Sequence, residues 1–238
     1  MKIIRLESVD STSSYLQSVA AECDHGTVVI AREQTAGRGQ RGNHWESEPG
    51  KNLTFSLMLR PIDILASEQF AISEAVALGI ATTLEQHLGQ PVEVKWPNDI
   101  YVGDSKICGI LIENAISGRG ITRSIAGIGI NVNQAEFRSD APNPVSMRQL
   151  SGHEFDLDTM LSETVSAILA NLELPHDTLH TLYQSRLYRR NGPHPYRDCL
   201  RGTDMMAEIV NVAPDGMLTL RDQEGTERVY AFKEVSFK

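Results

Sequence analysis

Glycine and arginine alternate in one stretch of the chain, GRGQRG at residues 37–42. Glycine lets backbone amides approach a ligand closely, and arginine supplies a permanently charged donor that matches carboxylate and phosphate oxygens. Apolar runs at residues 27–31 and 53–59 flank the stretch, which predicts a loop between two strands. The residue types therefore predict an anion-binding loop, with Arg38 and Arg41 as charged donors.

The same glycines satisfy the G-x-G-x-x-G pattern of nucleotide-binding loops. A dinucleotide fingerprint requires a helix after the loop, whereas residues 46–51 are turn-rich and precede a β-rich segment. A kinase loop lies between strands, but the chain contains neither HRD nor DFG. Taken alone, the loop also fits a glycine-rich surface hairpin with solvated arginines.

Residues 10–14, DSTSS, precede apolar residues at helical spacing. Ser11 or Thr12 can cap the start of a helix. Hydroxyls and free amides at a helix start can also bind a polar ligand group, so a structural and a binding role both stay open for these residues.

Residues 92–113 contain two β-rich runs around a predicted hairpin turn at residues 103–104. Pro97 interrupts the first run and predicts a bend that carries Asn98 and Asp99. An ordinary turn explains the same residues without a ligand.

Lys95 and Lys106 are expected on strands that can be neighbours, where lysines also serve to discourage aggregation. Residues 122–132 form a further predicted strand, in which GIGIN permits close backbone approach and ends at Asn131. His176 and His180 are four residues apart, a spacing that could place two metal ligands on one helix face. The sequence has no glutamate of the H-E-x-x-H pattern between them and no evident third ligand, so we expect both side chains to face solvent.

The composition is that of a soluble globular protein: 238 residues, 41% hydrophobic, 22% charged, with a net charge of −9. The acidic balance argues against a nucleic-acid partner. Three scattered cysteines predict a reducing, cytoplasmic location, and no run has the length of a signal peptide or membrane span.

The periodicity predicts an α+β fold, with a mixed β-sheet and packed helices at residues 1–188 and a small β-barrel at residues 189–238. Strands are expected at residues 2–9, 27–33 and 53–60, and helices at 67–88, 157–172 and 178–188. Beyond the proline- and glycine-rich residues 189–195, strands are expected at 206–212, 217–221, 227–232 and 234–237.

Five strings, DST, QTAGRGQRG, KWPND, KICGILIE and GIGIN, stand in the order and spacing of the biotin protein ligases. The chain resembles their class II synthetase-like catalytic domain up to about residue 185, followed by a small SH3-like domain. Because the first predicted strand begins at about residue 2, the N-terminal helix-turn-helix of some family members is expected to be missing.

The resemblance implies a ligase reaction in two steps. The carboxylate of biotin attacks the α-phosphate of ATP, used with Mg²⁺, to give biotinyl-AMP and pyrophosphate. A lysine of a biotin carboxyl carrier domain of a carboxylase then attacks the mixed anhydride. The implied partners are biotin, ATP and the carrier domain, with no nucleic acid and no membrane, for a monomer or homodimer.

The resemblance also implies roles for individual residues. The implied catalytic cations are Lys106 and Arg38. Biotin is expected to contact Ser11, Thr12, Ser13, Gln34, Arg38, Gly39, Gln40 and Lys106. ATP or the adenylate is expected to contact Arg41, Trp45, Asn98 and Asn131, and Mg²⁺ is expected at Asp99.

Two alternatives remain open at this point. A lipoate or octanoate transferase is the nearest other enzyme, although hydrogen-bonding residues for a ureido ring suit an apolar dithiolane poorly. A biotin-sensing module without catalysis is the other, and retention of Lys106 and the glycine and arginine loop argues against it.

Many members of the resembled family carry arginine where this chain has Gln40, and glutamine cannot neutralise charge. Either Arg41 compensates or fewer charges hold the adenylate. We expect Gln40→Arg to slow escape of biotinyl-AMP into solvent, measured as release of labelled adenylate after rapid dilution. Equal release rates for the two proteins would contradict this expectation.

Overall fold

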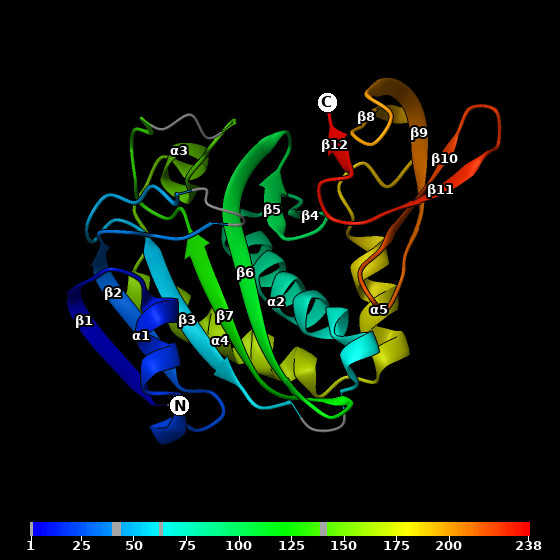
Figure 1. Cartoon of the computed structure of the whole chain (residues 1–238). Helices are drawn as coiled ribbons and strands as arrows, with labels where there is room; N and C mark the ends of the chain where they lie inside the picture. Colours follow the sequence, from blue (N-terminus) through cyan, green and yellow to red (C-terminus); the bar gives the residue numbers. More distant parts are fainter. Residues whose placement is uncertain (1, 40–43, 62–63, 139–141) are drawn as a thin grey trace.

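The computed structural model describes residues 2–39, 44–61, 64–138 and 142–238, which form two β-sheets and their covering helices (Figure 1). The strands are β1 (Ile3–Val9), β2 (Val28–Gln34), β3 (Leu53–Leu59), β4 (Glu93–Lys95), β5 (Asp99–Val102), β6 (Ser105–Ser117), β7 (Gly120–Ile130), β8 (His194–Asp198), β9 (Thr203–Val212), β10 (Leu218–Asp222), β11 (Glu227–Tyr230) and β12 (Val235–Phe237). The α-helices are α1 (Thr12–Ser18), α2 (Phe70–Leu88), α3 (Met147–Ser151), α4 (Leu157–Leu172) and α5 (His176–Ser185).

The larger sheet has seven strands in the order β1-β2-β3-β7-β6-β5-β4. Strands β1 and β2 run parallel, and every other neighbouring pair is antiparallel. The predicted mixed sheet is therefore confirmed, as is the predicted hairpin turn, where Gly103 has φ 55° between β5 and β6. No helix within the described residues combines the length and apolar character needed to cross a membrane.

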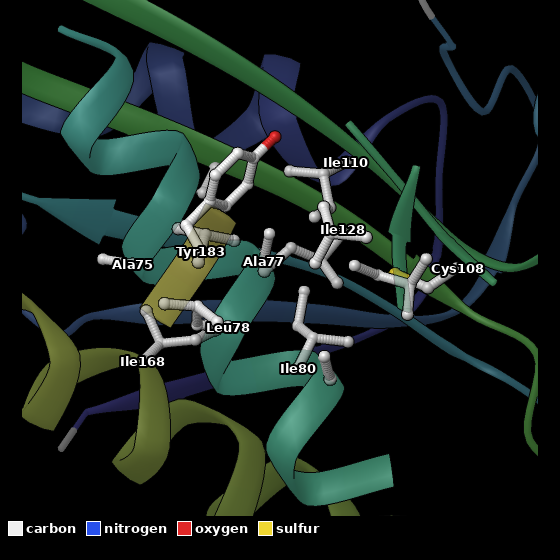
Figure 2. Close-up of a cluster of buried hydrophobic side chains, with 14 of the residues drawn as sticks. Ala75, Ala77, Leu78, Ile80, Cys108, Ile110, Ile128, Ile168 and Tyr183 are labelled. Carbon is white, nitrogen blue, oxygen red and sulfur yellow. The ribbon is translucent and has the colours of Figure 1, made fainter. Parts of the chain in front are cut away.

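Both faces of this sheet are covered, because successive strand residues point to opposite sides. On one face, Leu16 of α1 packs with Val29, Met58 and Ile125. On the other, the side chains of α2 face the strands, and Figure 2 shows Ala77 and other residues of α2 beside Ile110 and Ile128. Helix α1 therefore covers part of the face that also carries the cavity described below.

Helices α2 and α4 pack against each other on the same face of the sheet, where Asp158 of α4 also pairs with Arg5 of β1. A glycine in α2 allows the close approach of the two helices. A Cβ added to Gly79 would lie 2.7 Å from the backbone nitrogen of Ile168. Ile72, Val76 and Ile80 are among the fully buried residues of α2. Figure 2 shows Ile168 of α4 beside Leu78 of α2.

The second sheet is a separate antiparallel sheet in the order β11-β10-β9-β8-β12, consistent with the predicted small SH3-like barrel. Its core joins that of the first sheet. The Trp96 indole donates to the Gly216 carbonyl at 2.9 Å, and the rings of Trp96 and Phe232 lie 5.3 Å apart. The boundary at residue 188 stays a prediction; the chain passes between the sheets between Ser185 and His194.

Three local predictions need correction. Helix α5 spans His176–Ser185 instead of residues 178–188, and β8, which was not predicted, begins inside residues 189–195, expected to be only a boundary. The prediction of a solvent-facing His180 is wrong, because its Nδ1 lies 2.7 Å from Oε1 of buried Glu74. Burial raises the pKa of Glu74, and the hydrogen bond with His180 opposes that shift, so the histidine partly compensates a buried acid.

Candidate active site

A cavity of about 570 Å³ opens on the sheet face that carries α1. It collects residues from the N-terminal helix, the loop after β2, the bend before β5, and strands β6 and β7. All the predicted site residues that the structure describes line it: Ser11, Thr12, Ser13, Gln34, Arg38, Gly39, Trp45, Asn98, Asp99, Lys106 and Asn131. Gln40 and Arg41 lie outside the described residues.

Three glycines form the floor of the cavity. Gly109 of β6 pairs directly with Gly129 of β7, and Gly127 lies two residues along on the same face. A Cβ on Gly129 would lie 2.3 Å from Cε2 of Trp45, and a Cβ on Gly109 would lie 2.9 Å from its Cζ3. The indole of Trp45 therefore rests on backbone where any side chain would displace it.

Hydroxyl and amide groups lie at the Gly127 end of this floor. A Cβ on Gly127 would lie 2.5 Å from Oγ of Ser13. Oε1 of Gln34 accepts from the backbone N–H of Thr12 at 2.8 Å and from its hydroxyl at 3.0 Å. Ser56 lies within 2.9 Å of the hydroxyls of both Thr12 and Ser13, and these side chains of α1 and β3 are buried. The start of α1 is therefore both a helix terminus and a wall of hydrogen-bonding groups.

The two predicted catalytic cations line the same cavity, and each holds a carboxylate. Nζ of Lys106 lies 2.7 Å from Oδ1 of Asp99, and both side chains are 23% exposed. The guanidinium of Arg38 lies 2.7 Å from Glu113 across the loop and β6. An anion that enters the cavity would compete with the carboxylates of Asp99 and Glu113 for the two cations, because the anion and both carboxylates present negatively charged oxygens.

Lys95 does not join this cluster. It lies on β4 and Lys106 lies on β6, so β5 separates two lysines that were expected on strands able to neighbour each other. Its Nζ donates to the hydroxyl of Tyr101 at 2.8 Å. Burial lowers the pKa of Lys95, and the nearby charge of Asp99 opposes that shift.

The two predicted asparagines have partly structural roles. The amide of Asn98 donates to the carbonyl of Ile110, which ties the bend to β6. The amide of Asn131 donates to the carbonyl of Val145 at 3.1 Å. Its Oδ1 and the Trp45 Nε1 are buried and find no hydrogen-bond partner among the described residues. One acceptor and one donor therefore remain unused at this end of the cavity.

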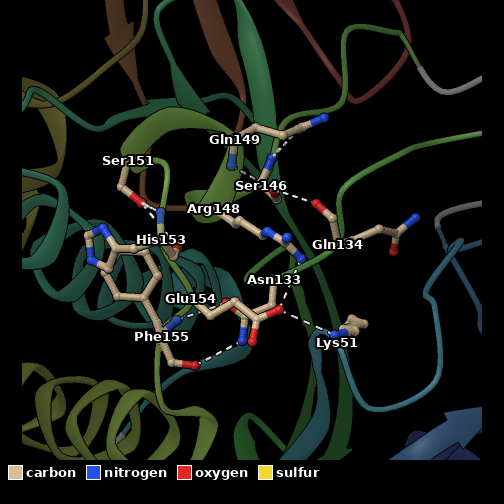
Figure 3. Close-up of polar contacts among 10 residues, drawn as sticks. All are labelled: Lys51, Asn133, Gln134, Ser146, Arg148, Gln149, Ser151, His153, Glu154 and Phe155. Carbon is tan, nitrogen blue, oxygen red and sulfur yellow. Dashed lines mark hydrogen bonds and ion pairs between the residues drawn. The ribbon is translucent and has the colours of Figure 1, made fainter.

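A polar network holds the segment after β7 that carries Asn131 (Figure 3). The side chain of Asn133 exchanges hydrogen bonds with the backbone of Phe155, at 2.8 and 2.9 Å. Ser146 caps α3 in a reciprocal box with Gln149 and donates to the carbonyl of Gln134 at 2.6 Å. The network fixes this wall by hydrogen bonds, where the chain has no regular strand.

Sequence reasoning missed several residues of the cavity. The signal for Gly127 and Gly129 was present, since GIGIN indicated close backbone approach, but the occupant of that space was not predicted. Glu113, the partner of Arg38, lay inside a matched string without an assigned role. Lys233 also lines the cavity, from the second sheet, and no pattern along the chain indicated that.

Comparison with known proteins gives the class. Residues 6–131 match the model of the biotin/lipoate A/B protein ligase family. The chain is 30% identical over 251 residues to the bifunctional ligase/repressor BirA of Bacillus spizizenii, covering 96% of this chain and 72% of that protein. It is 35% identical over 161 residues to the biotin--[acetyl-CoA-carboxylase] ligase of Paracoccus denitrificans, covering 66% and 67%.

The fold comparison agrees with the sequence comparison. The biotin protein ligase of Aquifex aeolicus, solved in complex with biotin and ATP, aligns with a TM-score of 0.80 and 26% identity, covering 100% of this chain and 98% of that one. The chain belongs to the biotin/lipoate A/B protein ligase family.

The glycine floor generates a prediction. Gly129→Ala would place a methyl group inside the indole ring of Trp45, so the ring must leave the floor. We expect acrylamide quenching of tryptophan fluorescence to increase. Gly120→Ala is the matched control, because it lies on the same strand and its added Cβ would meet only a carbonyl at 3.8 Å. Equal quenching of the two variants would contradict the proposed contact.

Proposed function

We propose that the protein is an ATP-dependent biotin protein ligase. It activates biotin as biotinyl-AMP with release of pyrophosphate, and then transfers biotin to a lysine of a carboxyl carrier domain. The observation that carries the proposal is that Arg38 and Lys106 line one cavity with the hydroxyl cluster of α1 and with Trp45. The relatives named above supply the reaction class.

Activation joins two anions, and cations are the means by which this cavity lowers the barrier. Arg38 and Lys106 offset the charge of the carboxylate and the α-phosphate, and their contacts strengthen as charge develops on phosphorus. Both already hold carboxylates in the structure, at 2.7 Å each. The oxygens of the ligand take the place of these carboxylate oxygens, so each cation exchanges one negatively charged oxygen partner for another.

The hydroxyl end of the cavity suits the ureido ring of biotin, which has two N–H donors and one carbonyl acceptor. Ser11, Thr12 and Gln34 supply matching groups, and Ser11 and Thr12 are buried, where an unpaired polar atom is costly. The apolar dithiolane of lipoate and the alkyl chain of octanoate can form no hydrogen bonds with these groups, so they gain less than biotin does from this end of the cavity. This difference in hydrogen bonding favours biotin over lipoate and octanoate as the acid that the protein activates.

The opposite end of the floor suits the nucleotide. Trp45 offers an aromatic face, and its Nε1 and Oδ1 of Asn131 offer the unused donor and acceptor. Asp99 fits a single-carboxylate contact to Mg²⁺, because its Oδ2 makes no hydrogen bond with any described residue. The described residues hold no group of three or more metal-binding side chains, so the ion would take its other ligands from phosphate and water. When bound, Mg²⁺ neutralises phosphate charge.

Pyrophosphate exchange into ATP tests the proposal, with biotin, lipoate and octanoate supplied in turn. We expect exchange with biotin to exceed that with either other acid, because only biotin satisfies the hydroxyl cluster. Faster exchange with lipoate or octanoate would assign the chain to the other branch of the family. Exchange with none of the acids would indicate a binding module.

Lys106→Ala tests the role of the cation. We expect it to cost about 3 kcal/mol of transition-state stabilisation, on the order of a hundredfold in the exchange rate. Lys51→Ala is the control, since Lys51 also pairs with a carboxylate, at 3.3 Å, but does not line the cavity. Near-normal adenylation by Lys106→Ala would remove Lys106 from the site.

A further inference from the structure

Lys233 lies in the turn between β11 and β12 and lines the cavity, although every other lining residue belongs to the part of the chain before the second sheet. The preceding residue, Phe232, anchors the turn. Its ring lies 5.3 Å from that of Trp96, which is three residues before Asp99. The turn is therefore held beside the bend of the cavity that carries Asp99, at the end away from the hydroxyl cluster of α1.

The backbone of this turn is unusual for lysine. The N–H of Glu234 donates to the carbonyl of Ala231 at 3.1 Å, and the N–H of Ala231 donates to Oε2 of Glu234 at 2.8 Å. Lys233 is the third residue of the closed turn and has φ 71°, while Phe232 is not among the positive-φ residues. That pattern favours glycine at the third position, so the lysine here stores backbone strain.

Lys233 also differs from Arg38 and Lys106 in its charge pairing. Arg38 and Lys106 each hold a carboxylate, whereas Lys233 has no ion pair or hydrogen bond from its side chain among the described residues. A strained residue that carries a free cation at a cavity mouth indicates a ligand anion, since a glycine would build the turn at lower cost. The nearby Asp99 and Lys106 locate that anion at the phosphate end.

We propose that Lys233 binds the β- and γ-phosphates of ATP, so that the second sheet supplies a cation to the pyrophosphate leaving group. This inference rests on the proposed function. The lysine stabilises the negative charge that pyrophosphate gains when the bond between the α-phosphorus and the bridging oxygen breaks. Lys233 does not contact biotin or the α-phosphate, which Arg38 and Lys106 serve.

Calorimetric binding of Mg-ATP and of AMP to the full chain tests the assignment. In Lys233→Met the dissociation constant for Mg-ATP is expected to rise about tenfold, because a charge-assisted contact is lost, while that for AMP stays unchanged. Lys233→Arg should remain close to the parent protein. The matched control is Lys2→Met, because Lys2 forms no ion pair with any described residue and lies outside the cavity. Unchanged Mg-ATP binding, or an equal loss for AMP, would overturn the assignment.

Lys233→Gly keeps the test decisive if the methionine variant folds poorly. It removes the charge and suits the positive φ, so its midpoint of thermal unfolding should equal or exceed that of the parent, with the same loss of Mg-ATP affinity. A glycine variant with full Mg-ATP affinity would refute the role of the lysine. The proposed function fails separately, if the parent protein binds Mg-ATP but exchanges pyrophosphate with none of the three acids.

Discussion

The pairing of Gly109 with Gly129 across β6 and β7 is the constraint on which the site depends. On one face of these strands, Cys108, Ile110 and Ile128 are buried with the core under α2. On the other face the glycines leave bare backbone, so the indole of Trp45 can approach it. One pair of strands thus builds a packed core below and a ligand floor above, because side chains alternate between the two faces.

The ion pairs beside this floor provide the charged groups of the cavity but contribute little to the stability of the fold. Arg38 and Glu113 are 42% and 43% exposed, and ion pairs of that exposure contribute roughly 0–1 kcal/mol. The pair can therefore be exchanged for a ligand anion at small cost. The side chains of Lys106 and Asp99 are only 23% exposed. Removing either one would leave the other as a partly buried charge without its partner. Within the cavity, Arg38 and Lys106 are therefore each compensated by a neighbouring carboxylate.

The sequence allowed the cavity to be predicted where chemistry and backbone geometry coincide in short strings. Gly39, Pro97 and Asn131 each carry a local signal, namely a permissive backbone, a forced bend or a strand end. Contacts between distant segments carry no such local signal. Glu113 and Arg38 are 75 positions apart, and Glu74 and His180 are 106 positions apart. Strand β8 was missed because Gly192, Pro193 and Pro195, before and at the start of the strand, suggested only a boundary.

The two sheets contact each other at the bend that carries Asp99. Trp96 faces away from the cavity, where its indole donates to Gly216 and its ring packs on Phe232. Two residues farther, the side chain of Asn98 ties the bend to β6. A shift of the second sheet therefore acts on Trp96 and, through a rigid bend, on Asp99 and its partner Lys106. The second sheet is thus a structural support for the end of the cavity that carries Asp99 and Lys106.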